Sequence, residues 1–268
     1  MKKMTILLLV LAICFCGTAI AEDAGDRGDA LAGTLVDGVY EVRIPCTQEE
    51  ANRWTAEDPG KEDGVVSLES AAWENGALIA RYSPVGDGEQ TVRILRYDDL
   101  LAAKEVYTFD ILVKNGAIQE VPGGSYAAAP SDDELEPHLS GEWLQEETQW
   151  ESMFVSRNPE GGWDIEILSP ISHAAAVFLG RFSYDCYEDA LICMDGKLYE
   201  APITDDETES GLGKLLAEDL QARIAFEAGE SEDALRLVVF TDMHEFSPVP
   251  FVRVEAFGGV LPEEQPEL

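Results

Sequence analysis

Hydrophobic and polar residues alternate in short segments along most of the chain, with the period of a β-strand. In residues 38–45, Tyr40, Val42 and Ile44 fall on one side of the segment, whereas Glu41 falls on the other. Successive side chains of a strand point to opposite faces, so this pattern predicts a strand with one buried face. Segments of the same kind follow in the first half at 64–75, 76–84, 89–97 and 105–121.

Turn signals separate these segments. The strongest is Asn115-Gly116, which stands between two apolar runs and predicts a two-residue β-hairpin turn. The second half resumes the alternating pattern at 152–158, 161–170, 175–185, 190–203, 235–242 and 250–257. Residues 213–227 have leucines with helical spacing, but they could equally form two strands broken at 217–221, and the surrounding rhythm favours strands.

The pattern breaks between the two halves, where residues 123–139 are rich in proline, glycine and acids. We interpret them as a linker. Ser131 and Glu134 have capping-box spacing, which predicts one helical turn around 132–135 that Pro137 ends. The organisation expected is a signal peptide at 1–21, a flexible acidic leader at 22–34, a sandwich at 35–122, the linker, a barrel at 140–258 and a disordered tail at 259–268.

The N-terminus has the features of a secretory signal peptide. Lys2 and Lys3 precede an apolar run at 6–13, and the small residues Ala19 and Ala21 lie just before Glu22. The run is shorter than the roughly 20 residues that cross a bilayer. The sequence therefore predicts a cleaved, secreted chain at the bacterial cell surface or outside the cell, without membrane insertion after cleavage.

The chain is strongly acidic, with a formal charge of -35 from 53 acidic and 18 basic residues. Such a charge repels nucleic acid and anionic membranes, so neither is an expected partner. Calcium would use carboxylates spaced around a glycine, but 86–90 and 204–210 lack that spacing. No group of His, Cys and carboxylates has metal-ligand spacing, and we expect neither a metal nor a cofactor.

Cys46, Cys186 and Cys193 remain after signal cleavage, an odd number that cannot form a complete disulfide framework. Residues 184–193 read as a hairpin that would bring Cys186 opposite Cys193, close enough for a disulfide. Two reduced, buried thiols are an equally good interpretation. Cys46 has no nucleophile signature around it.

The first region, in residues 44–59, 76–99 and 106–116, resembles the immunoglobulin-like sandwich of chagasin-type cysteine protease inhibitors. Because the matching segments do not carry the family's inhibitory loops, we expect Trp54 in the core and Arg96 as an ordinary charge at a strand end. The family's inhibitory N-P-T-T-G, glycine-rich and R-P-W loops are absent from the matching segments 46–52, 85–90 and 96–100.

The second region begins with Gly141-Glu142-Trp143, a G-x-W, and has Arg253 near its C-terminal end. It resembles the lipocalin and wider calycin barrels, which implies that Trp143 closes one barrel end and packs against Arg253. An arginine over an indole contributes roughly 0.5 to 2 kcal/mol. Segments 150–167 and 184–197 also resemble uncharacterised secreted modules of gut anaerobes. The predicted fold is all-β, an immunoglobulin-like β-sandwich followed by a calycin-like antiparallel β-barrel.

Candidate ligand-binding residues lie in this second region. Trp163 and Ile165 share one face of a strand, and with Phe178 and Phe182 they would line the interior of a hollow barrel. Trp150, set among acidic and polar residues, is the tryptophan expected to meet a ligand at the surface.

The sequence carries no catalytic constellation. Acidic residues are too numerous for any pair to indicate a general acid and base, and the nucleophile-elbow and phosphate-loop motifs are absent. The function expected is therefore that of a secreted, non-catalytic protein that binds an unknown protein or small-molecule ligand. The alternatives are a small-molecule carrier that uses the barrel interior and a cysteine protease inhibitor that acts through the first domain.

Overall fold

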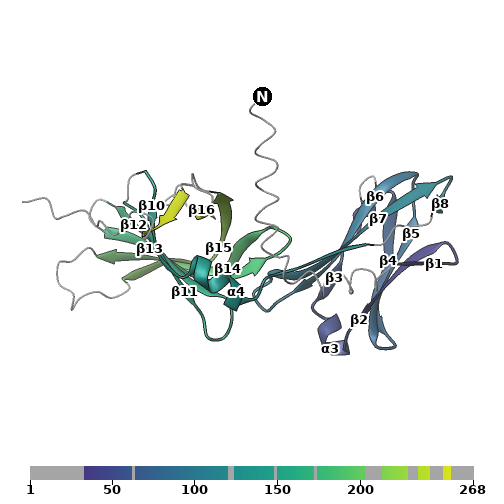
Figure 1. Ribbon diagram of the computed structural model, residues 1–268, viewed down its shortest axis with the longest axis horizontal. Helices are drawn as coiled ribbons and strands as arrows, with labels where there is room; N and C mark the ends of the chain where they lie inside the picture. The colour runs from purple at the N-terminus through teal and green to yellow at the C-terminus, as the bar shows by residue number, and fades with distance from the viewer. Residues whose placement is uncertain are drawn as a thin grey trace, which may run out of the picture. The chain divides into compact units, whose positions relative to one another are not determined.

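A computed structural model describes the protein at residues 33–61, 64–119, 124–147, 150–171, 174–202, 213–228, 235–241 and 250–254. The predicted signal peptide, most of the leader and the tail lie outside these residues. The chain divides into two compact units, and it passes from the first to the second between Ala129 and Pro130 (Figure 1). Leu100–Ala102 are grouped with the second unit. Both units consist mainly of β-strands, as predicted.

The first unit is a sandwich of two sheets. One sheet has the order β1-β2-β5-β4, and the other has the order β3-β6-β7-β8 with β9 also paired to β7. The strands are β1 (Thr34–Val36), β2 (Val39–Pro45), β3 (Trp54–Ala56), β4 (Val66–Glu74), β5 (Ala77–Pro84), β6 (Gly88–Tyr97), β7 (Ala103–Lys114), β8 (Ala117–Ile118) and β9 (Ser125–Ala128). Helix α3 (Gln48–Ala51) and the short 3-10 helix η2 (Pro59–Lys61) join them.

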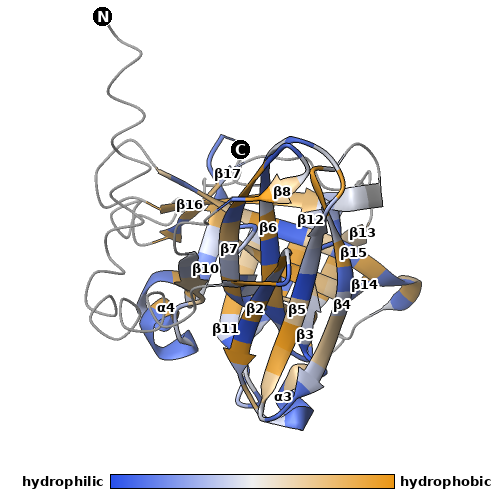
Figure 2. Cartoon of the chain, turned by 90° about the vertical axis from the view of Figure 1, so that its right-hand side faces the viewer, coloured by the Kyte–Doolittle hydropathy of each residue, from blue (hydrophilic) through white to orange (hydrophobic). Residues whose placement is uncertain are grey.

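The sandwich core forms where the apolar sides of the two sheets meet. Tyr40, Val42 and Ile44 are buried, as the alternation in β2 predicts, and they join Ile94 and Phe109 from the facing sheet in one cluster. Figure 2 shows hydrophobic and hydrophilic residues alternating along these strands.

The predicted Asn115-Gly116 turn is confirmed. Both residues have left-handed backbone angles, with φ of 52° and 71°, and β7 pairs with β8 on either side of them. The Asp87 carboxylate accepts hydrogen bonds from the backbone N–H groups of Asn115 and Gly116, at 3.0 and 2.8 Å. The turn is therefore held both by its own geometry and by a neighbouring side chain.

The second unit is an eight-stranded antiparallel barrel in which each strand pairs with the next along the chain and the last pairs with the first. Its strands are β10 (Gly141–Gln145), β11 (Ser152–Arg157), β12 (Trp163–Ile171), β13 (Ala174–Asp185), β14 (Ala190–Pro202), β15 (Lys214–Ala228), β16 (Leu235–Thr241) and β17 (Pro250–Arg253). Closure removes the free sheet edges that invite aggregation.

The segment predicted as a linker contains two regular elements. β9 belongs to the sandwich, because it pairs with β7, and helix α4 (Asp132–Leu139) precedes the barrel. The capping box between Ser131 and Glu134 is confirmed, but Pro137 lies inside the helix and does not end it. A proline in a helix removes one N–H and therefore one backbone hydrogen bond, and the short α4 tolerates this.

Lys214–Ala228 form the single strand β15, so the helical interpretation of 213–227 is wrong. β15 is also continuous through 217–221, so it is not two strands, although Asp219 has a φ of 57° and the pairing with β14 shifts nearby. A β-bulge of this kind inserts a residue without ending the strand. Leu215 and Leu216 are exposed near the start of β15, whereas Leu220 packs against the barrel core.

No helix within the described residues is long and apolar enough to cross a membrane.

Candidate functional site

The four residues predicted to line a hollow barrel are buried in its core. Trp163, Ile165, Phe178 and Phe182 are at most 2% exposed and belong to one contiguous cluster of apolar side chains. The rings of Phe178 and Phe182 meet edge to face with centroids 6.1 Å apart. Spacing along the strands thus predicted the correct face of the barrel.

The packing around Phe178 is tight. A Cβ added to Gly196 on β14 would lie 2.3 Å from a ring carbon of Phe178, and one added to Gly180 would lie 2.7 Å from the Cys193 sulfur. The Phe178 ring thus packs directly against the bare backbone of Gly196, in a space that any other residue at this position would fill with its own Cβ. This part of the interior is filled by side chains, and it offers no ligand wall.

Trp143 and Arg253 lie at the seam where the barrel closes. They are register partners in the pairing of β10 with β17. The buried indole of Trp143 donates its N–H to the Leu139 carbonyl at 2.9 Å, and Arg253 donates to the Pro137 carbonyl at 2.8 Å and to the carbonyl of Ser140. Both side chains therefore tie α4 to the barrel wall at the end where Leu139 is buried.

The opposite end of the barrel interior is polar. Gln145, Glu151 and Ser169 are the inward-facing residues nearest that end on β10 to β12, and all three are buried. The Ser169 hydroxyl donates to one carboxylate oxygen of Glu151 at 2.9 Å, whereas the other oxygen has no hydrogen-bond partner in the described part of the chain. Burial raises the pKa of Glu151, and the Ser169 hydrogen bond opposes the rise. Sequence reasoning missed this carboxylate among so many others.

The expected alignment of Cys186 with Cys193 is wrong. The hairpin pairs Asp185 with Ala190, which leaves Cys186 in the turn and places Cys193 three residues along the returning strand. Cys193 is a free thiol in the barrel core, and burial raises its pKa to about 11. The Asp185 carboxylate accepts hydrogen bonds from the backbone of Tyr187 and Glu188, which fixes the turn without a covalent link.

Two aromatic side chains of this part of the barrel are exposed, Phe154 on the outer side of β11 and Trp150 just before that strand. Trp150 is 74% exposed and Phe154 is 54% exposed. Phe154 pairs in register with Glu142 on one side and with Glu166 on the other, and both glutamates are exposed. We call this surface the β10–β12 outer face and define it by Glu142, Trp150, Ser152, Phe154, Glu166 and Leu168.

A shallow hollow of about 100 Å³ lies in this outer face, lined by all its members except Trp150 and floored at Met153. The exposure of Trp150 agrees with the expectation from its polar surroundings. Phe154 was missed, although strict alternation in 152–157 places it opposite the buried Met153 and Val155.

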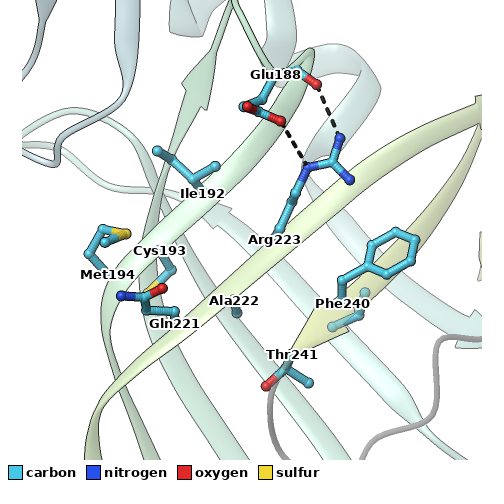
Figure 3. Close-up of a pocket in the computed structure, with 10 residues that line it drawn as sticks. Glu188, Ile192, Cys193, Met194, Gln221, Ala222, Arg223, Phe240 and Thr241 are labelled. Atoms are coloured by element: carbon cyan, nitrogen blue, oxygen red, sulfur yellow. Dashed lines mark hydrogen bonds and ion pairs between the residues drawn. The ribbon is translucent and has the colours of Figure 1, made fainter. Parts of the chain in front are cut away.

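A larger groove of about 690 Å³ crosses the outer side of β14, β15 and β16 (Figure 3). Arg223 lies at its centre and donates to the Glu188 carbonyl at 3.2 Å, with the Glu188 carboxylate 3.8 Å away. Its guanidinium also lies 5.7 Å from the centroid of the exposed Phe240 ring. The charge of Arg223 is thus already matched within the protein, which leaves the groove without an unpaired cation.

The sandwich residues singled out by the chagasin-type resemblance have structural partners. The Trp54 ring lies 5.5 Å from that of Tyr107, and Arg96 donates to the Glu105 carboxylate at 2.7 Å. In the segment 46–52, Thr47 and Glu50 form a capping box that begins α3.

Metal-ligand geometry does not occur in the described part of the chain, where no three His, Cys, Asp or Glu side chains are grouped to hold an ion. No protein-family model matches the chain, and neither a curated protein nor a solved structure does.

Proposed function

We propose that this is a secreted, non-catalytic binding protein that holds its partner on the outside of the barrel, at the β10–β12 outer face. The observation that carries the proposal is the contrast between the two faces of the barrel wall. Inward aromatic residues such as Trp163 are enclosed in a packed core, whereas Trp150 and Phe154 are exposed. Exposed aromatic residues are typical of binding surfaces.

Secretion is supported by the signal-peptide features of the first 21 residues. The strong negative charge fits an extracellular protein, because it keeps the chain soluble and repels acidic surfaces. Neither argument names the partner.

The carrier alternative needs space inside the barrel near Trp163 and Phe178, where the collision expected at Gly196 argues for tight packing. The inhibitor alternative has no supporting observation in the sandwich, since the matching segments lack the inhibitory loops and Trp54 and Arg96 are engaged within the fold.

Capture from spent culture medium tests the proposal. The full-length mature protein is immobilised beside a Trp150→Ala/Phe154→Ala variant, and retained molecules are identified by mass spectrometry. Phe240→Ala is the matched control, because it removes an aromatic side chain of similar exposure from another part of the same wall.

The proposal predicts a molecule that the wild type and the Phe240→Ala variant retain and that the double variant loses. Equal retention by all three proteins would contradict it. A small molecule released only when the purified protein is unfolded would contradict it as well and favour the carrier.

A further inference from the structure

The row Glu142, Phe154 and Glu166 has a specific chemistry. These residues stand side by side on three adjacent strands, so the two glutamates flank the aromatic ring. Adjacent strands are about 4.8 Å apart, which puts the backbones of the two glutamates roughly 10 Å from each other. A group placed over the ring would lie within reach of both carboxylates.

Neither Glu142 nor Glu166 takes part in an ion pair with another described residue. Three other acidic residues of this unit do have arginine partners, since Asp133 and Glu136 share Arg157 and Glu160 pairs with Arg181. Arginines in the described part of the second unit therefore neutralise some of its carboxylates but not the two carboxylates of this row.

The hollow beside Phe154 limits the size of the group that this row can bind. Its volume of about 100 Å³ corresponds to roughly three water molecules, so it accommodates a single side chain and not a drug-sized molecule. Its lining combines the two carboxylates with the apolar surfaces of Phe154 and Leu168. The long stem and terminal charge of a lysine or arginine match such a lining.

We propose that the β10–β12 outer face recognises a lysine or arginine side chain presented by a basic segment of a protein partner. The cation lies over the Phe154 ring between Glu142 and Glu166, and the stem covers Leu168. A cation over an aromatic face is attracted by the ring, and two carboxylates add charge-assisted hydrogen bonds. This inference rests on the binding function proposed above and specifies the chemistry of the partner.

Charge decides among the possible occupants. A second copy of a chain with a formal charge of -35 would bring carboxylates against this acidic row, and nucleic acid would bring phosphates. A basic protein segment is complementary on both counts. Electrostatic attraction would also speed its association and make that association sensitive to salt.

The test uses a fluorescein-labelled, lysine-rich peptide and the full-length mature protein, with affinity measured by fluorescence anisotropy at physiological ionic strength. The two informative variants are Glu142→Gln/Glu166→Gln and Phe154→Ala. Glu49→Gln/Glu89→Gln is the matched control, because it removes two exposed carboxylates from the sandwich and changes the net charge equally. The same peptide with acetylated lysines is the ligand control.

We expect each informative variant to bind the peptide at least about tenfold more weakly than the wild type. The matched control should stay within about twofold of the wild type, because general attraction to an acidic protein does not depend on this row. Thermal unfolding of each variant verifies that the barrel is intact.

Three results would overturn the inference. The first is that the control pair weakens peptide binding as much as Glu142→Gln/Glu166→Gln does, and the second is that neither informative variant changes the affinity. The third is that Phe154→Ala alone weakens peptide binding, which would indicate a neutral partner stacked on the ring. Failure of the inference is distinguishable from failure of the proposed function. If capture depends on Trp150 and Phe154 but the peptide does not bind, only the cationic chemistry is wrong. If capture does not depend on these residues and the peptide does not bind either, the β10–β12 outer face is not a binding surface.

Discussion

Trp143 and Arg253 face each other across the seam that closes the barrel, and both side chains bind the carbonyl groups of the segment that enters it. Gly141 has a φ of 133°, and a Cβ at this position would lie 3.4 Å from the Arg253 Nε atom. The glycine of the G-x-W thus supplies a backbone conformation that residues with a side chain rarely adopt, beside the arginine that reaches the end of α4. Closure of the barrel and docking of the helix depend on the same few residues.

Replacing Trp143 by alanine should destabilise the barrel by about 3 to 5 kcal/mol, because the change empties a large buried site and leaves the Leu139 carbonyl without its donor. Urea unfolding followed by far-UV circular dichroism measures the loss. Trp150→Ala is the control and should cost less than about 0.5 kcal/mol, since its side chain is exposed. A loss below about 1 kcal/mol for Trp143→Ala would contradict its burial.

Gly196→Ala tests whether the barrel is filled. The new methyl group would collide with the Phe178 ring, so we expect a loss of about 1 to 3 kcal/mol in the free energy of unfolding. Adding Phe178→Leu should recover part of that loss, and a double-mutant cycle measures the coupling. If Gly196→Ala costs nothing, the ring has space to move and the interior is open to a ligand.

Glu151→Gln should alter how stability depends on pH. Burial raises the pKa of Glu151, so the folded state favours the protonated form more than the unfolded state does. The stability that comes from this proton is fully present below the unfolded pKa, about 4.3, and is lost as pH rises through the folded pKa. The variant should therefore gain stability relative to the wild type between pH 4 and pH 7, as urea titrations would show. A constant difference across that range would mean that Glu151 ionises as it does in water.

Cys193 should resist alkylation in the native protein. It is buried, its pKa is raised to about 11, and the thiolate is the reactive form. Brief treatment with iodoacetamide at pH 8, before and after unfolding in urea, followed by peptide mass spectrometry, compares the two states. We expect Cys193 to be labelled only after unfolding. Finding it in a disulfide with Cys186 would contradict the hairpin register.

The sequence predicted much of the barrel and the sandwich because alternation and turn chemistry are local properties. Trp163 and Phe178 were assigned to the inner face from spacing alone, and Asn115-Gly116 marked its hairpin. The G-x-W correctly marked the first barrel strand. Each of these features is decided within a few residues of the chain.

The errors arise where strand register decides the outcome, either within one hairpin or between segments that are distant in the sequence. The alignment of Cys186 with Cys193 depends on a hairpin register that the turn residues alone did not fix, and β15 depends on a bulge at Asp219 and on two neighbouring strands. The row formed by Glu142, Phe154 and Glu166 exists only because three strands are in a particular register, so no single segment could reveal it.

Indole N–H resonances of uniformly ¹⁵N-labelled protein, titrated with the lysine-rich peptide, test most directly whether binding occurs outside a filled barrel. Trp150 belongs to the β10–β12 outer face, whereas Trp143 and Trp163 are enclosed in the core. The account predicts that the Trp150 signal moves with peptide concentration while those of Trp143 and Trp163 stay in place. Movement of the Trp163 signal with Trp150 unchanged, or no movement of any indole signal, would contradict it.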